Sequence, residues 1–384
     1  MPITEIQVTC PVFDSFRVQQ IAGMFDVSLS EKCTERFKVE VPSLEEPWEV
    51  GLIVGPSGSG KSTIASQLFG ETLYRESAWP ADLAVIDCFE NLPVRQVIEL
   101  FTAVGFSSPP SWVKPYQVLS TGERFRCDLA RALSLGREPR AESPEPDNGG
   151  SRLLTLDARP LVVFDEFTSV VDRNVAKACS TAIAKGIRRG NIPCRFIAVT
   201  CHYDVAEWLE ADWVLDMATG QLQRRRLRRP PIHVEVYRCG MAAWELFKRH
   251  HYLSGSLAPG AQCFLGLWEG NPVTFCATLP VLTKKNHRRF TRIVTLPDYQ
   301  GMGIGMKVVV AVADKLRSEG KRINVTSSHP ALIRHCKHSP LWKAVNVKKT
   351  GASPRGTERF KNYRSSSGRA VVSFEYLGEV WKAE

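Results

Sequence analysis

A glycine-rich stretch that ends in a lysine and two hydroxyl residues directly follows a short apolar run. Residues 55–63 read GPSGSGKST, and Val50–Val54 precedes them. Glycines at this spacing let the backbone curl so that its N–H groups face phosphate oxygens at a helix N-terminus. The pattern predicts a nucleotide phosphate-binding loop, in which the lysine reaches the β- and γ-phosphates and the first hydroxyl binds Mg²⁺. The candidate ligands are Gly55, Ser57, Gly58, Gly60, Lys61, Ser62 and Thr63, with Ser62 also a metal ligand.

Two adjacent carboxylates end a second apolar run. Asp165 and Glu166 follow the residues LVVF at 161–164, which are typical of a buried parallel strand. A carboxylate can hold Mg²⁺, and a second carboxylate can polarise an attacking water. We therefore predict Asp165 as a metal ligand and Glu166 as the catalytic base of nucleotide hydrolysis.

Three further segments complete an ordered set: LSTGE at 119–123, SVVD at 169–172 and Cys201-His202. Together with the two motifs above, this set resembles the ABC ATPase family over most of residues 10–220. The resemblance implies that Ser120 and Gly122 contact the γ-phosphate of a nucleotide held by a second copy, that His202 senses that phosphate, and that ATP and Mg²⁺ lock a homodimer. It also makes Asp172 a nucleotide-site residue.

The sequence departs from that family pattern at a few positions. Thr121, Glu123 and Phe167 stand where glycine, glutamine and proline are usual. No clear glutamine of the family pattern occupies the stretch expected between the glycine loop at 55–63 and the segment at 119–123. An aromatic residue upstream of the glycine loop is expected to stack on adenine. Phe16 and Phe25 are candidates, although aromatic side chains more often belong to a core.

A second glycine-rich turn lies between two predicted strands and before a helix with a broad apolar face. Residues 298–305 read DYQGMGIG, and such a turn can hold an anion at the helix N-terminus or simply allow tight packing. The wider wording, RIVTLP at 292–297 followed by Q-x-x-G-x-G, resembles the acyl-CoA-binding motif of the GNAT acyltransferases over roughly 238–345. The resemblance implies an acetyl-CoA, or another acyl-CoA, held by Val294, Gln300, Gly301, Gly303, Ile304 and Gly305.

A weaker resemblance concerns the acceptor. The residues HHYLS at 250–254, within a basic domain, are similar to the Mom-like branch of GNAT proteins, which modifies adenine bases of DNA. That resemblance makes His251 and Tyr252 candidate acid–base residues. The alternative is that they pack as ordinary half-buried residues at a helix end.

Charge divides the chain into two parts. Residues 1–220 hold 21 Lys and Arg against 30 Asp and Glu, whereas 221–384 hold 29 against 10, within a total of +10. Excess positive charge is typical of domains that face nucleic acid or another polyanion, and it also favours solubility alone. Where the charge changes sign, the residues RRRLRRPP at 224–231 form a basic linker that two prolines terminate.

These features predict an α/β protein with two domains. We expect an ABC-type P-loop ATPase at 1–223 with an irregular loop at 137–151, the linker at 224–231, and an α+β GNAT-like domain at 232–384 that ends in a hairpin with a basic flank. In the second domain we expect a helix at 242–251, strands at 263–268, 272–278, 290–295 and 323–326, and a long helix after residue 305.

Composition sets the remaining bounds. Hydrophobic residues are 43% and charged residues 23%, no apolar run is long enough to span a bilayer, and the eleven cysteines form no C-x-x-C pair. We expect a cytoplasmic protein with reduced thiols, with DNA rather than a membrane as partner. The alternatives are a protein or small-amine acetyltransferase regulated by ATP, and a switch ATPase with a non-catalytic CoA- or nucleic-acid-binding module.

Overall fold

The computed structural model describes residues 4–9, 11, 13–29, 34–75, 78–134, 159–251, 256–282, 284–348 and 370–378. Contacts divide the chain into two compact units. Unit 1 comprises Met1–Ser77, Ala132–Val170 and Ala184–Arg229, and unit 2 comprises Ala78–Arg131, Val171–Ile183 and Pro230–Glu384. Two segments from the first half of the sequence thus belong to the same unit as Pro230–Glu384. The division at Arg229 falls within the predicted basic linker.

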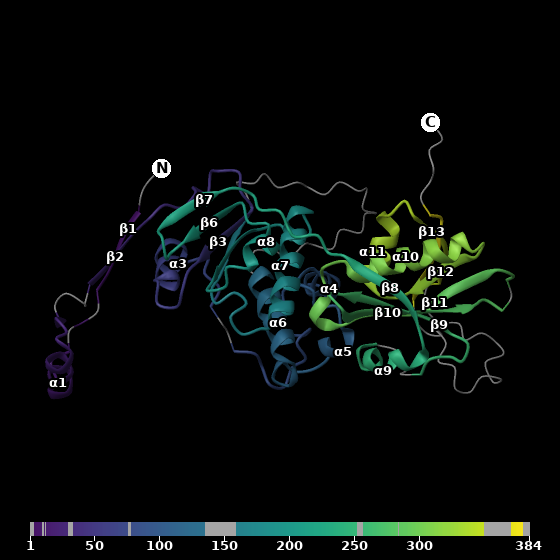
Figure 1. Cartoon of the computed structure of the whole chain (residues 1–384), viewed down its shortest axis with the longest axis horizontal. Coiled ribbons are helices and arrows are strands. Elements are labelled where there is room, and N and C mark those ends of the chain that lie inside the picture. Colours follow the sequence, from purple (N-terminus) through teal and green to yellow (C-terminus); the bar gives the residue numbers. More distant parts are fainter. Residues whose placement is uncertain are drawn as a thin grey trace. The chain divides into compact units, whose positions relative to one another are not determined.

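Unit 1 is built on a five-stranded sheet of order β4-β5-β3-β6-β7. Its strands β3, β6 and β7 are labelled in Figure 1. Its members β4, β5, β3 and β6 run parallel, and β7 closes the edge antiparallel to β6. Buried apolar runs explain the parallel arrangement, since both faces of such a sheet are covered. The strands are β3 (Val50–Val54), β4 (Leu161–Phe164), β5 (Arg195–Thr200), β6 (Trp213–Asp216) and β7 (Gln221–Arg224).

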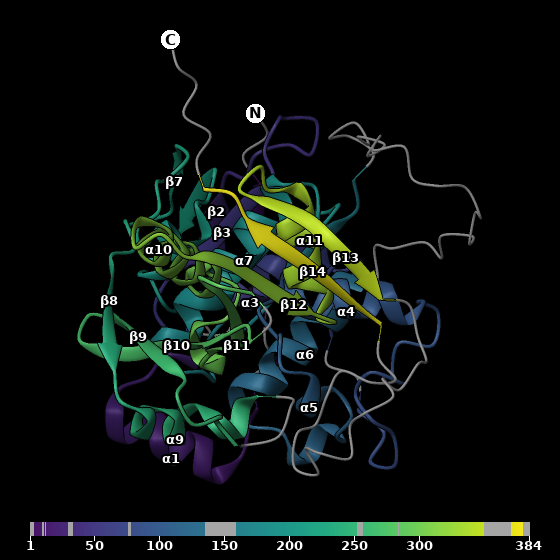
Figure 2. The same ribbon diagram turned by 90° about the vertical axis from the view of Figure 1, so that its right-hand side faces the viewer.

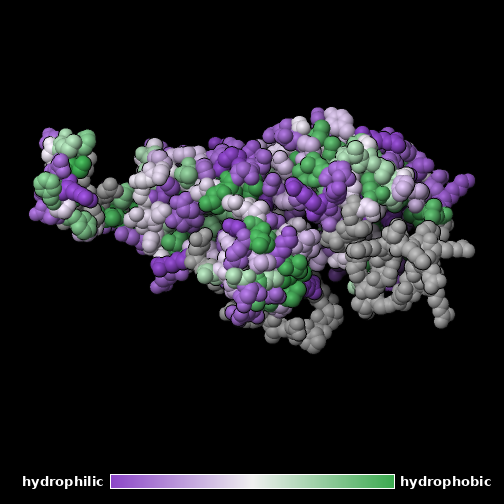
Figure 3. Space-filling model, turned by 90° about the horizontal axis from the view of Figure 1, so that it is seen from below, coloured by the Kyte–Doolittle hydropathy of each residue, from purple (hydrophilic) through white to green (hydrophobic). Residues whose placement is uncertain are grey.

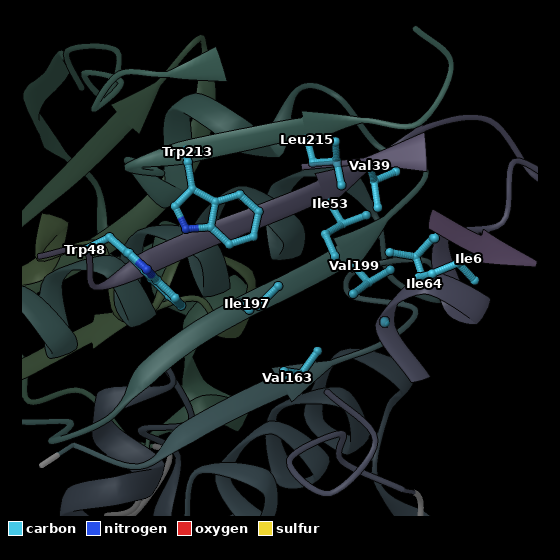
Figure 4. Close-up of a cluster of buried hydrophobic side chains, with 11 residues drawn as sticks. Ile6, Val39, Trp48, Ile53, Ile64, Val163, Ile197, Val199, Trp213 and Leu215 are labelled. Atoms are coloured by element: carbon cyan, nitrogen blue, oxygen red, sulfur yellow. The ribbon is translucent and has the colours of Figure 1, made fainter. Parts of the chain in front are cut away.

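The core of unit 1 surrounds Trp213, which is 1% exposed. Figure 4 shows this indole on β6 among branched aliphatic side chains of the neighbouring strands, with Trp48 close by. The two indoles meet edge to face at 5.5 Å between ring centroids. A hairpin of β1 (Thr4–Thr9) and β2 (Thr34–Val39) adds Ile6 and Val39 to the same cluster. Unit 1 also contains the helices α3 (Lys61–Phe69) and α8 (Val205–Leu209).

The helix α1 (Phe16–Phe25) stands apart from this core, because none of its residues is buried. Phe16 and Phe25 are 83% and 67% exposed, and Figure 3 shows apolar side chains on the surface of this helix. The alternative that these two phenylalanines are core residues is therefore wrong.

The first part of unit 2 is helical. It contains α4 (Val94–Ala103), α5 (Pro109–Trp112), the 3₁₀ turn η1 (Tyr116–Val118) and most of α6 (Thr121–Ser134). Aromatic rings hold these short elements together: the Phe101 ring contacts those of Phe89, Phe106 and Trp112. The helix α7 (Arg173–Arg188) begins in this unit and ends in unit 1.

The second part of unit 2 is a seven-stranded sheet of order β13-β14-β12-β11-β10-β9-β8. In Figure 2 the yellow β14 lies beside β13, and α10 and α11 accompany the sheet. Only β11 and β12 pair in parallel, because a helix, α10, connects them. The strands are β8 (Val234–Cys239), β9 (Gln262–Trp268), β10 (Asn271–Pro280), β11 (His287–Thr295), β12 (Arg322–Ser327), β13 (Trp342–Lys348) and β14 (Val371–Tyr376).

The element predictions for this part are confirmed with two adjustments. All four predicted strands are present, and the helix after residue 305 is α10 (Ile304–Ser318), followed by α11 (Pro330–His338). The segment expected as one helix at 242–251 is instead three short turns: η3 (Met241–Ala243), α9 (Trp244–Phe247) and η4 (Lys248–His250). β14 pairs antiparallel with β13, as a terminal hairpin requires, but the basic flank and the loop at 137–151 lie outside the described residues.

Candidate functional site

The first glycine loop connects β3 to α3. Gly58 and Gly60 have φ values of +79° and +82°, a backbone region that favours glycine, and Gly60 caps the N-terminus of α3. The first-turn N–H groups of a helix lack intrahelical partners and suit an anion. The Lys61 ammonium group is 2.8 Å from the carbonyl oxygen of Pro56, so it folds back over the loop. The loop therefore has the conformation and charge that a nucleotide phosphate chain requires.

The carboxylates follow β4, at the same edge of the sheet as the glycine loop. This placement results from topology, because β4, β5 and β3 are adjacent and parallel and their carboxyl ends meet at one edge. Glu166 is exposed and has a φ of +50°, which is unusual for a residue with a side chain. The Asp165 carboxylate accepts a hydrogen bond of 2.8 Å from the Glu166 N–H. Strain of this kind is a feature of functional sites.

His202 follows β5, between the two preceding segments in the order of the strands. The Thr200 hydroxyl accepts a hydrogen bond from the His202 N–H at 3.2 Å. The His202 Nδ1 is 3.4 Å from the hydroxyl of Thr168, a buried residue with a φ of +66°. Thr168, two residues after the candidate base, thus connects the histidine to the carboxylate segment. Sequence analysis missed it, because nothing in its local spacing sets it apart.

An aromatic side chain that sequence analysis also missed lies against the glycine loop. A Cβ atom at Gly60 would come within 2.5 Å of the Phe37 ring, so the ring on β2 packs directly on that glycine. Phe37 is partly buried at the edge of the core cluster. It is a third aromatic candidate for the adenine contact, beside the exposed Phe16 and Phe25.

In unit 2, Ser120 and Glu123 form a helix capping box at the start of α6. The Glu123 carboxylate accepts hydrogen bonds of 3.0 Å from both the N–H and the hydroxyl of Ser120, and one of 2.6 Å from the Ser111 hydroxyl. Burial would raise the pKa of Glu123, but these hydrogen bonds outweigh it and lower the pKa. The glutamate in place of the usual glutamine therefore has a structural reason. In this structure the Ser120 hydroxyl bonds to it.

Asp172 caps the N-terminus of α7. Its carboxylate accepts hydrogen bonds from the N–H groups of Asn174 and Val175 at 2.8 and 3.1 Å. Gly122 packs near Val175, since a Cβ at Gly122 would be 3.4 Å from that side chain. Gly122, the predicted γ-phosphate contact, and Asp172, a predicted nucleotide-site residue, therefore lie at the neighbouring starts of α6 and α7.

The second glycine loop connects β11 to α10. Gly301 and Gly303 have φ values of +90° and +89°, and Gly303 caps α10. Gly305 allows the helix to approach the strand, because a Cβ there would be 2.5 Å from the Thr295 hydroxyl. Val294 and Ile304 are buried, so their side chains face the interior and only their backbones are open to a ligand role. The loop, called the cradle below, thus has a backbone conformation that suits an anion at a helix N-terminus.

The strands on either side of α10 separate next to this cradle. Within the described residues, the parallel ladder between β11 and β12 joins His287–Phe290 to Arg322–Val325 and ends there. On its other side, β11 has a bulge: Phe290 and Arg292 pair with Thr278 and Ala277, and Thr291 is left over. Backbone N–H groups that lose their strand partner in this way can donate hydrogen bonds to a ligand. The carbonyl oxygen of a thioester needs such donors.

The Gln300 side chain is already hydrogen-bonded within the protein at both ends of its amide. Its Oε1 accepts a hydrogen bond of 2.8 Å from the Ser107 N–H, and its Nε2 donates to the Thr295 carbonyl at 3.0 Å. Both ends of the amide are thus used within unit 2. The resemblance to the GNAT motif implies that this residue contacts acyl-CoA, and that role stays a prediction for its backbone.

The candidate acid–base residues lie after α9. The ring of His251 meets Trp244 edge to face at 5.8 Å between centroids, which places it on an apolar cluster, and Tyr252 lies outside the described residues. The neighbouring His250 has a pKa lowered by burial and by Arg249, against the opposing influence of Glu123 and Asp298. A histidine that is neutral at pH 7 can accept a proton. The Nε2 of His250, however, already accepts a hydrogen bond of 3.0 Å from the Arg249 Nε.

Other site types are not found among the residues that the structure describes. Within the described ranges, no group of three or more His, Cys, Asp or Glu side chains is arranged to hold a metal ion. None of the described helices has the length and apolar character needed to cross a membrane. The described cysteines are free thiols, as predicted.

The chain thus has two glycine loops at helix starts, one after β3 in a mainly parallel sheet and one after β11 in a mainly antiparallel sheet. A model of the acetyltransferase (GNAT) family matches residues 222–335. This match confirms the prediction of a GNAT acetyltransferase domain in the second half of the chain. No curated protein matches the chain.

Solved structures of acetyltransferases and of ABC transporter cassettes are similar to parts of the chain. The ribosomal-protein-S18-alanine N-acetyltransferase of Escherichia coli shares 16% identity over 40% of this chain and 99% of its own, with a TM-score of 0.29. A dimeric bacterial ABC transporter cassette shares 14% identity over 50% of this chain and 93% of its own, with a TM-score of 0.35. A GNAT acetyltransferase from Elizabethkingia anophelis with acetyl-CoA bound shares 9% identity over 38% and 98%, with a TM-score of 0.28.

Proposed function

We propose that this chain hydrolyses ATP and transfers an acetyl group from acetyl-CoA to a nucleic-acid base. The observation that supports acyl transfer most strongly is the loop at Gly301–Gly305, which caps α10 beside the point where β11 and β12 separate. A diphosphate would lie on the helix N-terminus, and the free strand edge would hold the acyl arm. Acetyl-CoA supplies the activated thioester, and this chain's backbone donors would stabilise the charge that develops on its carbonyl oxygen.

ATP hydrolysis is supported by the meeting of three segments at one edge of the sheet of unit 1. The loop with Lys61 would cradle the phosphates, Ser62 and Asp165 would hold Mg²⁺, and Glu166 would orient water. His202, bonded to Thr168 and Thr200, would sense the γ-phosphate. Two copies would close on ATP through the segments at Ser120–Gly122.

A nucleic-acid acceptor is supported by charge. The excess of basic residues lies in the second half, and Arg334, Lys337 and Lys343 are exposed on α11 and β13, two elements that pack together. Basic side chains on a surface bind phosphates and release counterions. Chemistry on a base would further require the base to leave its stack.

The test is acetyl-CoA consumption by the purified protein with ATP, offered duplex DNA, RNA or a basic protein in turn, followed by mass analysis of the acceptor. A gain of one acetyl group on nucleic-acid bases supports the proposal. A gain on protein or a small amine would replace the acceptor with the alternative class. Acetyl-CoA binding without turnover on any acceptor would favour a non-catalytic module.

Charge can be tested separately with matched variants. Lys337→Gln with Lys343→Gln is expected to weaken DNA binding and to reduce the slope of log affinity against log salt by about 2 for duplex DNA. Arg95→Gln is the control, since Arg95 is 87% exposed on α4 and forms an ion pair with Glu99 on the same helix. An equal effect of the two changes on the slope would argue against this surface.

A further inference from the structure

A buried arginine joins the start of α6 to the loop before the acyl-CoA cradle. Arg126 is 1% exposed, its Nη1 donates to the Gly122 carbonyl at 3.2 Å, and its Nη2 donates to the Pro297 carbonyl at 2.9 Å. Burying a guanidinium group is costly unless hydrogen bonds compensate. Two backbone carbonyls 175 positions apart are therefore held by one cation: Gly122, predicted to contact a γ-phosphate, and Pro297, a few residues before Gly303.

The backbone of Ser107 makes a second connection to the acyl-CoA site. Its N–H donates to the Gln300 side chain after β11, and its backbone also accepts a hydrogen bond from the side chain of His329, which follows β12. These two loops leave the ends of the two strands that separate beside the cradle. Ser107, from the helical part of unit 2, thus spans both sides of the predicted acyl-CoA cleft.

Close backbone packing makes these connections stiff. A Cβ at Gly105 would be 2.8 Å from the Gln300 carbonyl oxygen, and a Cβ at Gly301 would be 3.0 Å from the Gly105 Cα and 2.7 Å from the Ala182 Cβ. The helix start at Asp172 also reaches this loop, since the Asn174 amide is 3.4 Å from the Tyr299 hydroxyl. Because backbone atoms are in direct contact, a displacement of one segment is transmitted to the other.

We propose that Arg126 is a positioning residue through which the ATP-contacting segment at Gly122 sets the conformation, and hence the acyl-CoA affinity, of the loop at Pro297–Gly303. The inference rests on the proposed function of both sites. When a γ-phosphate engages Gly122, its carbonyl moves relative to Arg126, and the bond to Pro297 transmits the change. ATP and acyl-CoA binding are then coupled, and by linkage each changes the affinity of the other by the same factor.

The experiment measures acetyl-CoA affinity of the full chain by calorimetry, with and without a non-hydrolysable ATP analogue and Mg²⁺. We expect the analogue to change the acetyl-CoA Kd of the wild type by about 5-fold to 150-fold, the usual range for coupled sites. In Arg126→Met, which removes the guanidinium group together with its hydrogen bonds to Gly122 and Pro297, the ratio of the two Kd values is expected to fall to about 1.

The control is Arg124→Met on the same helix. Arg124 donates to Gln117 and lies over the Tyr116 ring, both within its own segment, so this change removes the same charge without touching the loop. It is expected to keep the wild-type ratio. If Arg126→Met does not fold, Gln300→Leu tests the second connection, and loss of the ratio is again expected.

The outcomes separate the two proposals. A wild-type ratio near 1 with both ligands bound overturns the coupling and leaves the proposed function intact. An unchanged ratio in Arg126→Met, or in Gln300→Leu where that variant decides, also overturns it. Failure of the wild type to bind acetyl-CoA overturns the proposed function, and the coupling with it.

Discussion

Replacement of Gly301 by alanine tests whether the acyl-CoA loop is packed against the helical part of unit 2 as the structure has it. Gly301 combines a φ of +90° with two close neighbours, Ala182 and Gly105. Gly270, in the turn between β9 and β10, has a similar φ of +77°, but a Cβ atom at this position would meet no described atom within 4 Å. Both lie in unit 2, so Gly270→Ala is a matched control.

The expected magnitude follows from these two environments. A side chain in this backbone region costs about 1–3 kcal/mol, and both variants lose that much. Gly301→Ala also places a methyl group 2.7 Å from the Ala182 Cβ, and such overpacking costs about 1–3 kcal/mol more. The free energy of unfolding of unit 2 is therefore expected to fall by about 1–3 kcal/mol more in Gly301→Ala than in Gly270→Ala.

Urea unfolding followed by tryptophan fluorescence measures this difference, provided that the slope with denaturant is unchanged. Calorimetry of acetyl-CoA binding adds a functional reading, in which Gly301→Ala is expected to bind more weakly and Gly270→Ala normally. Equal losses of stability in the two variants would refute the close packing of this loop.

Three further predictions concern single residues. Glu166→Gln is expected to retain ATP binding, lose roughly 100-fold or more in hydrolysis rate and accumulate an ATP-bound dimer on size-exclusion chromatography, because only the water-orienting carboxylate is removed; normal hydrolysis would contradict the assignment. Gly303→Val is expected to weaken acetyl-CoA binding by about 10-fold or more, since a branched residue at a φ of +89° strains the cradle, while ATP affinity stays unchanged in the same titration; full acetyl-CoA affinity would place the cradle elsewhere. Burial lowers the pKa of His329 in the folded protein despite its hydrogen bond to Ser107. The His329 side chain therefore binds a proton more readily in the unfolded chain than in the folded protein. Wild-type stability is expected to decline as pH falls below about 6.5 and to decline less in His329→Gln; identical pH slopes would count against it.

The sequence alone determined the features that depend on local spacing. The glycine, lysine and hydroxyl pattern at 55–63 and the carboxylates after 161–164 predicted a strand, loop and helix whose backbone conformation the structure confirms, because short motifs fix φ values and helix starts locally. The same holds for the loop at 298–305. The GNAT domain could be predicted because the residues RIVTLP at 292–297, followed by Q-x-x-G-x-G, resemble the acyl-CoA-binding motif of that family.

Only the tertiary structure decided which partners these residues have. Nothing near Gln300 in the sequence indicates that its side chain bonds to Ser107, or that Arg126 joins Gly122 to Pro297. Phe37 and Thr168 were missed for the same reason: their contacts with the glycine loop and with His202 arise from strands and turns that are distant in sequence. Spacing predicts the backbone of a site, whereas burial and long-range packing choose the side chains that surround it.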